Sequence, residues 1–307
     1  MAARSRQDPR TKPRAKPRAK QDRHFVTALS RGLEVLACFR TGDAMLGNGE
    51  LAERCHLPKS TVSRLAQTLA RLGYLRYVDD AAKYRLGAAT LGLGSTMLSG
   101  LSIRQLARPM MQEVADFSQS VVALGVRVGL GIIYIEVCRN KAALTLSLDV
   151  GSRVPIMTTA MGRAYLAIAP EEEREDVLDQ LRAIDEPGWP RERRTLEAAF
   201  EQHRKLGFCH SFGDWQSDVS GIAIGFHPSD GLPAMAINCG GPSFSLPREF
   251  LINEVRPRLA SVARRLEGTQ ALSNGRERNG SNEHNGRNGS PPPPLAPSPR
   301  RPPQRAR

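Results

Sequence analysis

The sequence has no long apolar run, and no stretch approaches the roughly 18 apolar residues that a membrane-spanning helix needs. Its basic N-terminus is not followed by the hydrophobic segment that a secretory signal requires. These two absences predict a protein that resides in the cytoplasm and has no membrane partner.

Cysteine is scarce as well. The chain of 307 residues contains five cysteines, an odd number, and no Cys-x-x-Cys spacing. This usage indicates reduced thiols in a cytosol rather than a disulfide framework or a zinc site. The nearest approaches to a ligand cluster are Cys55-His56 and Cys209-His210. Because adjacent residues rarely chelate one metal ion, we expect no metal site.

Three common catalytic signatures are also missing, namely a glycine-rich phosphate loop, HExxH and GxSxG. Cys209, His210 and Asp214 could be drawn as a catalytic trio, but such a set arises by chance in a chain of this length. We therefore expect neither an enzyme nor a bound cofactor. An enzyme of carboxylate metabolism fused to a DNA-binding module is the lesser alternative.

The formal net charge of +13 is concentrated at the two ends of the chain. Residues 1–24 carry nine Lys or Arg against two Asp, and residues 268–307 carry seven Arg against two Glu. The first segment repeats Lys and Arg with Pro, and the last is rich in Asn, Gly and Pro, so both are predicted to be disordered. A non-specific nucleic-acid-binding protein driven by these tails is a second alternative function.

One central stretch lacks acidic residues entirely, since no Asp or Glu lies between Lys59 and Val78. From Val62 onward, apolar residues recur there at three- and four-residue steps. This pattern predicts an amphipathic helix that begins near Pro58 and ends at Gly73. A shorter helix precedes it, and together they follow the helix-turn-helix plan, whose second helix enters the DNA major groove.

A hairpin follows this helix at once. Residues 74–78 and 83–86 alternate polar and apolar side chains around an Asp-Asp-Ala-Ala turn, which indicates two antiparallel strands. A solvated helix face is the plainer interpretation, but the missing acidic residues and the hairpin favour a winged helix-turn-helix over residues 25–87 that binds double-stranded DNA. The residues expected to contact DNA are Lys59, Ser60, Thr61, Ser63, Arg64 and Gln67 on the helix, and Arg76, Lys83 and Arg85 on the wing.

The segment before the helix-turn-helix and the segment after the hairpin are also helical by pattern. Residues 25–40 carry an apolar stripe that is expected to pack beneath the helix-turn-helix, namely Val26, Leu29, Leu33, Leu36 and Ala37. Residues 88–118 are interpreted as two connector helices whose apolar face is also a candidate dimer contact.

From residue 119 to residue 267 the pattern alternates between short strands and helices. Strands are expected at 120–128, 132–138, 144–148, 220–227 and 232–239, and helices at 155–167, 171–184, 195–206 and 245–267. Antiparallel strands with grouped helices predict an α+β domain.

Four short strings resemble, in their order and spacing, the IclR family of bacterial transcriptional regulators. They are LPKSTVSRLAQTLARLGYL, the wing end KYRLG, Ala107-Arg108-Pro109 and the loop PIMTTAMGRAYLA. The resemblance runs from about Phe25 to Glu267 and covers neither tail. It implies a ligand-responsive, nucleoid-associated regulator with a profilin- or GAF-like effector domain. Such regulators bind palindromic operators as a homodimer or a dimer of dimers.

The resemblance also implies where a small organic carboxylate would bind. In that family the ligand meets the start of the helix that follows the loop, here Thr159, Ala160 and Met161. The first N–H groups of a helix are unpaired, so this position suits an anion on physical grounds too. The other residues that the resemblance places around the effector are Ser211, Asp214, Trp215, Gly221, Asn238 and Gly240.

Several of these positions depart from the commoner family pattern. Ser211 stands where an acidic residue is usual, Gly221 where a cysteine is usual, and Asn238 and Gly240 where serines are usual. Small residues leave more room and Trp215 supplies an aromatic wall. We therefore expect an effector bulkier than a two- or three-carbon acid, such as an aromatic acid, whose catabolism the protein would control. The plainer alternative is an ordinary surface loop at residues 214–218.

Overall fold

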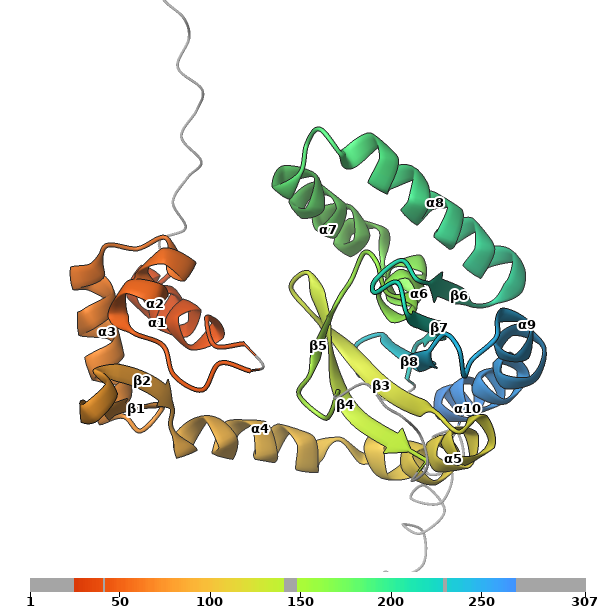
Figure 1. Cartoon of the computed structure of the whole chain (residues 1–307), viewed down its shortest axis with the longest axis horizontal. Helices are drawn as coiled ribbons and strands as arrows, with labels where there is room; N and C mark the ends of the chain where they lie inside the picture. Colours follow the sequence, from red (N-terminus) through yellow and green to blue (C-terminus); the bar gives the residue numbers. More distant parts are fainter. Residues whose placement is uncertain (1–24, 41, 141–147, 229–230, 269–307) are drawn as a thin grey trace, which may run out of the picture. The chain divides into compact units, whose positions relative to one another are not determined.

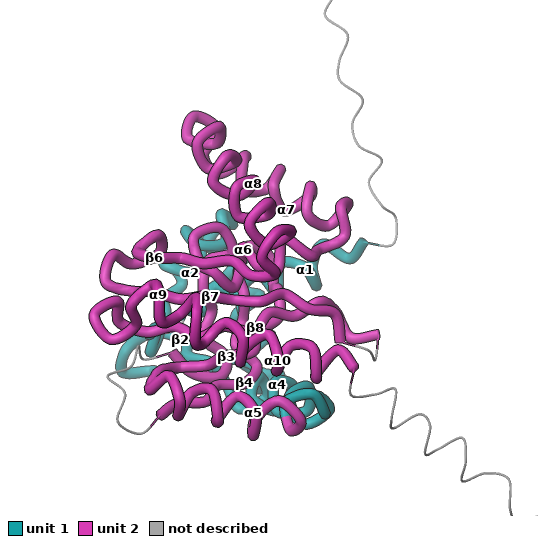
Figure 2. Tube along the Cα trace, turned by 90° about the vertical axis from the view of Figure 1, so that its right-hand side faces the viewer, with its two compact units in different colours: residues 1–104 teal, residues 105–307 magenta. Residues whose placement is uncertain are grey.

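The computed structural model describes residues 25–40, 42–140, 148–228 and 231–268 (Figure 1). The chain divides into two compact units between Arg104 and Gln105 (Figure 2). Both tails that were expected to be disordered lie outside the described residues, apart from Gly268. The class is the expected one, with a small helical domain that carries a hairpin and a larger α+β domain.

Three helices of the first unit enclose one small core. They are α1 (Thr27–Ala37), α2 (Asn48–Cys55) and α3 (Lys59–Arg71). The buried residues of this core come from the three helices, from the segments that follow α1 and precede α2, and from the wing: Val35, Cys38, Leu46, Leu51, Ala52, Val62, Ala66, Leu75 and Tyr84.

A tight turn joins α2 to α3. His56 follows α2 in the left-handed region at φ 52°, and the Leu57 N–H donates to the Ala52 carbonyl at 3.1 Å. Pro58 then precedes the first turn of α3, where its missing N–H would have had no helical partner. The predicted helix-turn-helix is therefore confirmed.

Gly73 ends α3, as its place in the sequence predicts. It adopts φ 81°, and its N–H donates to the Ala70 carbonyl at 3.1 Å while the Tyr74 N–H donates to the Leu69 carbonyl at 2.9 Å. This glycine cap satisfies the last carbonyls of the helix. The chain passes directly into the predicted wing, in which β1 (Leu75–Val78) pairs antiparallel with β2 (Lys83–Leu86).

The expected packing of α1 was wrong for four of the five residues of its stripe, since Ala37 is exposed as well and only Leu36 packs against the core. Val26, Leu29 and Leu33 are 61%, 63% and 57% exposed, whereas Val35 and Cys38 enter the core. The helix has two apolar faces, and periodicity identifies such faces without showing which one meets the neighbouring helices.

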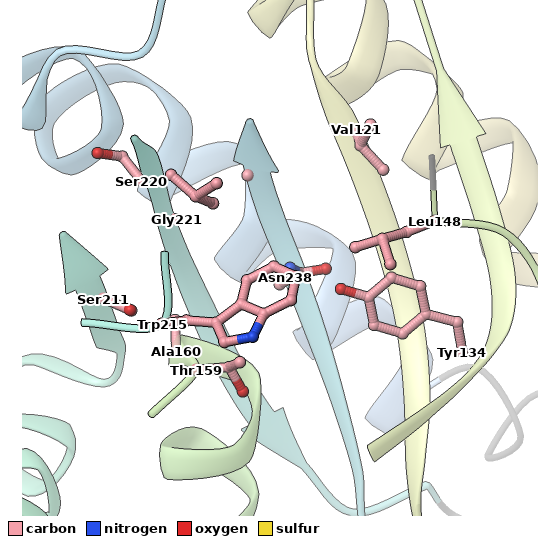
Figure 3. A pocket seen from close by; sticks show the side chains of 12 residues that line it. Val121, Tyr134, Leu148, Thr159, Ala160, Ser211, Trp215, Ser220, Gly221 and Asn238 are labelled. Carbon is pink, nitrogen blue, oxygen red and sulfur yellow. The ribbon is translucent and has the colours of Figure 1, made fainter. Parts of the chain in front are cut away.

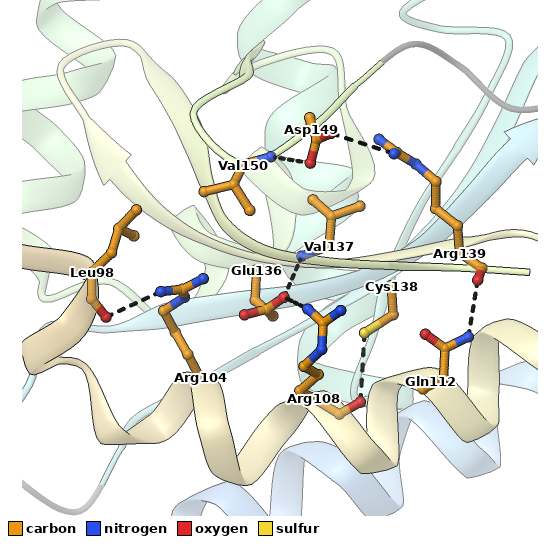
Figure 4. Close-up of polar contacts among 10 residues, drawn as sticks. All are labelled: Leu98, Arg104, Arg108, Gln112, Glu136, Val137, Cys138, Arg139, Asp149 and Val150. Atoms are coloured by element: carbon orange, nitrogen blue, oxygen red, sulfur yellow. Dashed lines mark hydrogen bonds and ion pairs between the residues drawn. The ribbon is translucent and has the colours of Figure 1, made fainter. Parts of the chain in front are cut away.

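The predicted connector forms two helices, α4 (Ala88–Gly100) and α5 (Ser102–Ser118). No residue of α4 is buried, and none of its thirteen residues is charged. The later part of α5 belongs to the second unit, where polar contacts join it to β4 (Gly131–Arg139) (Figure 4). Arg108 binds the buried Glu136 carboxylate at 2.5 Å, and Gln112 donates to the Arg139 carbonyl at 2.9 Å.

A six-stranded antiparallel sheet organises the second unit, in the order β5-β4-β3-β8-β7-β6. The long strands besides β4 are β3 (Val121–Val128), β7 (Val219–Phe226) and β8 (Met235–Pro242). Two short edge strands, β5 (Arg153–Pro155) and β6 (Cys209–Phe212), were not predicted. The strand expected at 144–148 lies almost wholly outside the described residues.

Helices cover both faces of this sheet. The helix α6 (Ala160–Ile168) packs on one face and is followed by α7 (Glu171–Ile184) and α8 (Trp189–Leu206) (Figure 1). The chain closes with α9 (Arg248–Phe250), a π-helical turn (Leu251–Val255) and α10 (Arg256–Gly268), which packs on β7 and β8.

Two glycines allow α6 to approach its neighbours closely. A Cβ at Gly162 would lie 2.0 Å from the Ile156 carbonyl oxygen, and one at Gly225 would lie 2.3 Å from the Ala164 carbonyl oxygen. Neither position accommodates a side chain without moving backbone. These contacts fix α6, and with it the loop at its N-terminus, against the sheet.

Candidate nucleic-acid interface and ligand pocket

The outward face of α3 is polar and accessible. Lys59, Ser60, Arg64 and Gln67 are exposed, and Thr61 and Ser63 are half-buried. Neither Lys59 nor Arg64 forms an ion pair with another described residue. The side chains at the N-terminal end of this helix are therefore available to an external anion, as base and phosphate contacts require.

The wing presents two further cations. Arg76 and Arg85 face each other across the β1–β2 pair, and both are exposed. Lys83 differs from them, because its Nζ binds the Glu50 Oε2 at 3.0 Å. Glu50 also accepts the Gly47 N–H at 2.8 Å, and this bond and Lys83 lower the pKa of its carboxyl. Lys83 thus ties the wing to the start of α2.

The N-terminus of α6 offers two unpaired donors. The Thr159 Oγ1 accepts the Gly162 N–H at 3.1 Å and donates to the Pro155 carbonyl at 2.6 Å. The N–H groups of Ala160 and Met161 precede the first intrahelical bonds and have no acceptor among the described residues. Such a helix end favours a carboxylate, because its N–H groups and its dipole both point at the ligand.

Ala160, the first of these donors, lines a pocket between α6 and the sheet (Figure 3). The space between its walls is about 480 Å³, part of it open to solvent. Seven of the nine residues expected around the effector line it, while Met161 and Asp214 do not. The lining residues are Val121, Tyr134, Leu148, Thr159, Ala160, Ser211, Trp215, Val219, Ser220, Gly221, Asn238 and Gly240.

The pocket is open at the β7–β8 pair because two glycines face each other there. Gly221 and Gly240 are paired across the strands, and a Cβ on either would lie 3.2 Å from a carbonyl oxygen of the neighbouring strand. Trp215 lines the same pocket, and its indole supplies an aromatic wall (Figure 3).

A polar pair lines the pocket on the sheet. Burial raises the pKa of the Tyr134 phenol to about 12, and a hydrogen bond with the Asn238 amide opposes this shift in part. The Asn238 Oδ1 is buried without a partner among the described residues. Tyr134 was missed in the sequence because it lies within a run of apolar strand residues, and a phenol in such a run is usually part of the core.

Asp214 binds a buried arginine instead of lining the pocket. Its carboxylate accepts Arg163 Nη1 at 2.7 Å, and the same guanidinium donates to the carbonyls of Met157 and His210, both at 3.0 Å. The Arg163 side chain is only 6% exposed. This contact joins α6 to the loop that carries Trp215.

The trio drawn from the sequence does not converge. The Asp214 carboxylate is engaged by Arg163, and the Cys209 thiol lies against the Ala199 carbonyl of α8 at 3.4 Å. Within the described ranges, no three His, Cys, Asp or Glu side chains gather as a metal site requires. In the same residues, no helix is both long and apolar enough to cross a membrane.

Two family models match the chain. The model described as the IclR helix-turn-helix domain matches residues 28–79, and the model of the C-terminal part of the bacterial transcriptional regulator IclR matches residues 95–267. The chain is 34% identical to the HTH-type transcriptional regulator TsaQ1/TsaQ2 of Comamonas testosteroni over 244 residues, which are 79% of this chain and 87% of that one.

Solved structures agree with this match. A crystal structure of an IclR family transcriptional regulator from Brucella abortus is similar with a TM-score of 0.75 and 41% identity, over 81% of this chain and 94% of that one. An IclR homologue from Microbacterium hydrocarbonoxydans, solved in complex with 4-hydroxybenzoate, shares the fold with a TM-score of 0.58 and 23% identity, over 78% and 98% of the two chains. The chain belongs to the IclR family and is a ligand-responsive, DNA-binding transcriptional regulator.

Proposed function

We propose that this regulator binds a palindromic operator through α3 and the wing and that an aromatic carboxylate in the pocket controls this binding. The observation that supports the DNA contact is the accessible face of α3, whose cations have no acidic neighbour on the same helix. Lys59, Ser60, Thr61, Ser63, Arg64 and Gln67 read base edges in the major groove, while Arg76, Lys83 and Arg85 hold the phosphate backbone.

A matched pair of arginines tests this assignment. Arg64→Ala should cost about 1–3 kcal/mol of DNA-binding free energy and relax specificity at one base position. Arg71→Ala is the control, because Arg71 is exposed on the last turn of the same helix. Binding is measured by fluorescence anisotropy on a duplex found by footprinting the DNA that flanks the gene. Equal losses for both variants would refute the assigned orientation of α3.

The ligand proposal follows from the chemistry of the pocket walls. The unpaired N–H groups of Ala160 and Met161 suit a carboxylate, and Trp215 and Val121 suit a ring. A bound 4-hydroxybenzoate in the Microbacterium homologue supports an aromatic acid here as well. The regulated genes would then serve the catabolism of such an acid.

Calorimetric titration with benzoate, 4-hydroxybenzoate and glyoxylate tests the ligand class. We expect the aromatic acids to bind and glyoxylate to bind far more weakly, because glyoxylate cannot bury surface against Trp215 and Val121. Binding of glyoxylate alone would overturn the proposal. Gly240→Ala should weaken the aromatic ligands, since its methyl group enters the pocket lining.

A palindromic site requires two copies of the chain, and the first unit exposes apolar side chains on α4 and on α1 that a second copy would cover. On α4, Leu91, Leu93 and Met97 are 74%, 62% and 54% exposed, and Leu29 and Leu33 of α1 are exposed too. We assign these residues to a homodimer contact, either alone or within a dimer of dimers. Leu91→Lys should shift sedimentation toward the monomer; an unchanged oligomer would refute this contact. As a DNA-binding regulator the protein acts in the bacterial cytoplasm, associated with the nucleoid.

A further inference from the structure

Two cysteine sulfurs meet in the DNA-binding unit although they are distant in sequence. Cys38 Sγ and Cys55 Sγ lie 2.9 Å apart, although the two residues are 17 positions apart along the chain. Cys38 caps the C-terminus of α1, and Cys55 is the last residue of α2. In the part of the chain that the structure describes, the other cysteines contact serine hydroxyls or carbonyls and no second sulfur.

Neighbouring contacts hold this pair in place. The Cys38 carbonyl accepts Arg54 Nη1 at 2.8 Å, and the same arginine binds the Asp43 carboxylate. Cys38 is 9% exposed and belongs to the core, whereas Cys55 is half-buried. The sulfurs of a disulfide are about 2.05 Å apart, so this pair needs to close by less than 1 Å. Rotation of the side chains supplies such a movement, and α1 and α2 can remain packed.

We propose that Cys38 and Cys55 are a modification site at which a low-molecular-weight disulfide, such as oxidised glutathione, forms an intramolecular disulfide. The thiolate of Cys55, the more accessible residue, attacks one glutathione sulfur and releases one reduced glutathione. Cys38 then attacks the Cys55 sulfur of the mixed disulfide and releases the second. Two electrons pass from the two cysteines to glutathione disulfide, and the two thiol protons leave with the two glutathione molecules.

The bond closes a loop that contains all of α2, and it joins α1 to the first helix of the helix-turn-helix. Neither sulfur belongs to α3, so the DNA-facing side chains keep their positions. A crosslink that fits the native structure stabilises it by restricting the unfolded chain. For a loop of this length in a small domain, the unfolding midpoint of the DNA-binding unit should rise by on the order of 10 °C.

Peptide mapping of the full-length protein tests the bond directly. The protein is incubated with oxidised glutathione at alkaline pH, where more of the Cys55 thiol is ionised, and is then quenched in acid, alkylated and digested with trypsin. Cleavage after Arg40 and Arg54 separates the two cysteines, so a Cys38–Cys55 disulfide appears as two joined peptides that dithiothreitol releases. Cys138→Ser should leave this product unchanged, whereas Cys55→Ser should abolish it.

Three results would overturn the proposal. The first is the absence of the joined peptides from the wild-type digest. The second is a stable glutathione adduct on Cys55, since this would show that the Cys38 sulfur cannot reach it. The third is a fall in the unfolding midpoint of the oxidised protein, because a strained bond would contradict the fit inferred from the packing. A raised midpoint together with the joined peptides supports the site, and neither result depends on the identity of the operator or the ligand.

Discussion

Removal of the Asp214 carboxylate should release Trp215 from the ligand pocket. The Arg163 side chain of α6 is buried, and its guanidinium donates a hydrogen bond to the Asp214 carboxylate. This bond fixes the loop that carries the Trp215 indole. A fully buried charge that loses its partner costs about 3–5 kcal/mol, and an exposed pair is worth at most about 1 kcal/mol. Asp214 is 43% exposed, and Arg163 keeps its bonds to two carbonyls. We therefore expect Asp214→Ala to reduce the free energy that holds the loop in place by about 1–2 kcal/mol. This is roughly a 5- to 30-fold shift toward conformations in which Trp215 has left the pocket.

Trp215 itself reports this shift. The chain has two tryptophans, so in a Trp189→Phe background the fluorescence comes from Trp215 alone. Asp214→Ala should increase quenching by acrylamide and move the emission to longer wavelength without any ligand. Asp218→Ala is the matched control, because Asp218 is exposed in the same loop and its side chain bonds no described residue. Equal quenching in the two variants would refute the role assigned to Arg163.

Three further measurements test other features. Gly162→Ala should destabilise the second unit by about 1–3 kcal/mol in urea unfolding, because its methyl group would meet the Ile156 carbonyl; unchanged stability would contradict the close approach of α6. Burial, followed by Cys38 and then Glu34, raises the pKa of Cys55 from 9.0 to about 12. The alkylation rate of Cys55 should therefore still rise about tenfold per pH unit through pH 10, whereas the rate of an ordinary thiol levels off there. The same shift stabilises the folded state below pH 9.0 and is lost as the pH rises toward 12. Deletion of residues 1–23 and 268–307 should leave sequence-specific DNA binding intact; complete loss would favour the tails as the binding element.

Features that depend on residues close together in the sequence could be predicted. The start of α3 at Pro58, its glycine cap at Gly73 and the wing follow from local backbone preferences, and the structure confirms each of them. The helix start at this loop was expected from the family resemblance instead, and the structure places it at Ala160, after Thr159. The face that α1 buries was not predictable, because only the positions of α2 and α3 decide between its two apolar sides.

The parts of the pocket that the sequence did not reveal depend on long-range contacts. Arg163 and Asp214 are 51 positions apart, and α7 and α8 lie between them in the sequence. No local sequence pattern indicates that this arginine would bind this aspartate. Tyr134 lies on β4 and Asn238 on β8. The two side chains meet only because the fold places β4 and β8 on either side of β3, and this strand order cannot be read from a local pattern. The short edge strands β5 and β6 have three and four residues, which is too few for a period to be recognised.

The facing glycines at positions 221 and 240 have a consequence for the evolution of such regulators. The depth of the cavity at this point is limited by main chain, and a single methyl group on either strand would make it shallower while the ladder of hydrogen bonds stays the same. Ligand preference can therefore change through one small substitution, to which the facing carbonyl adjusts by a few tenths of an ångström. Relatives that share this scaffold could diverge in the compounds they detect by exchanges at these two positions alone.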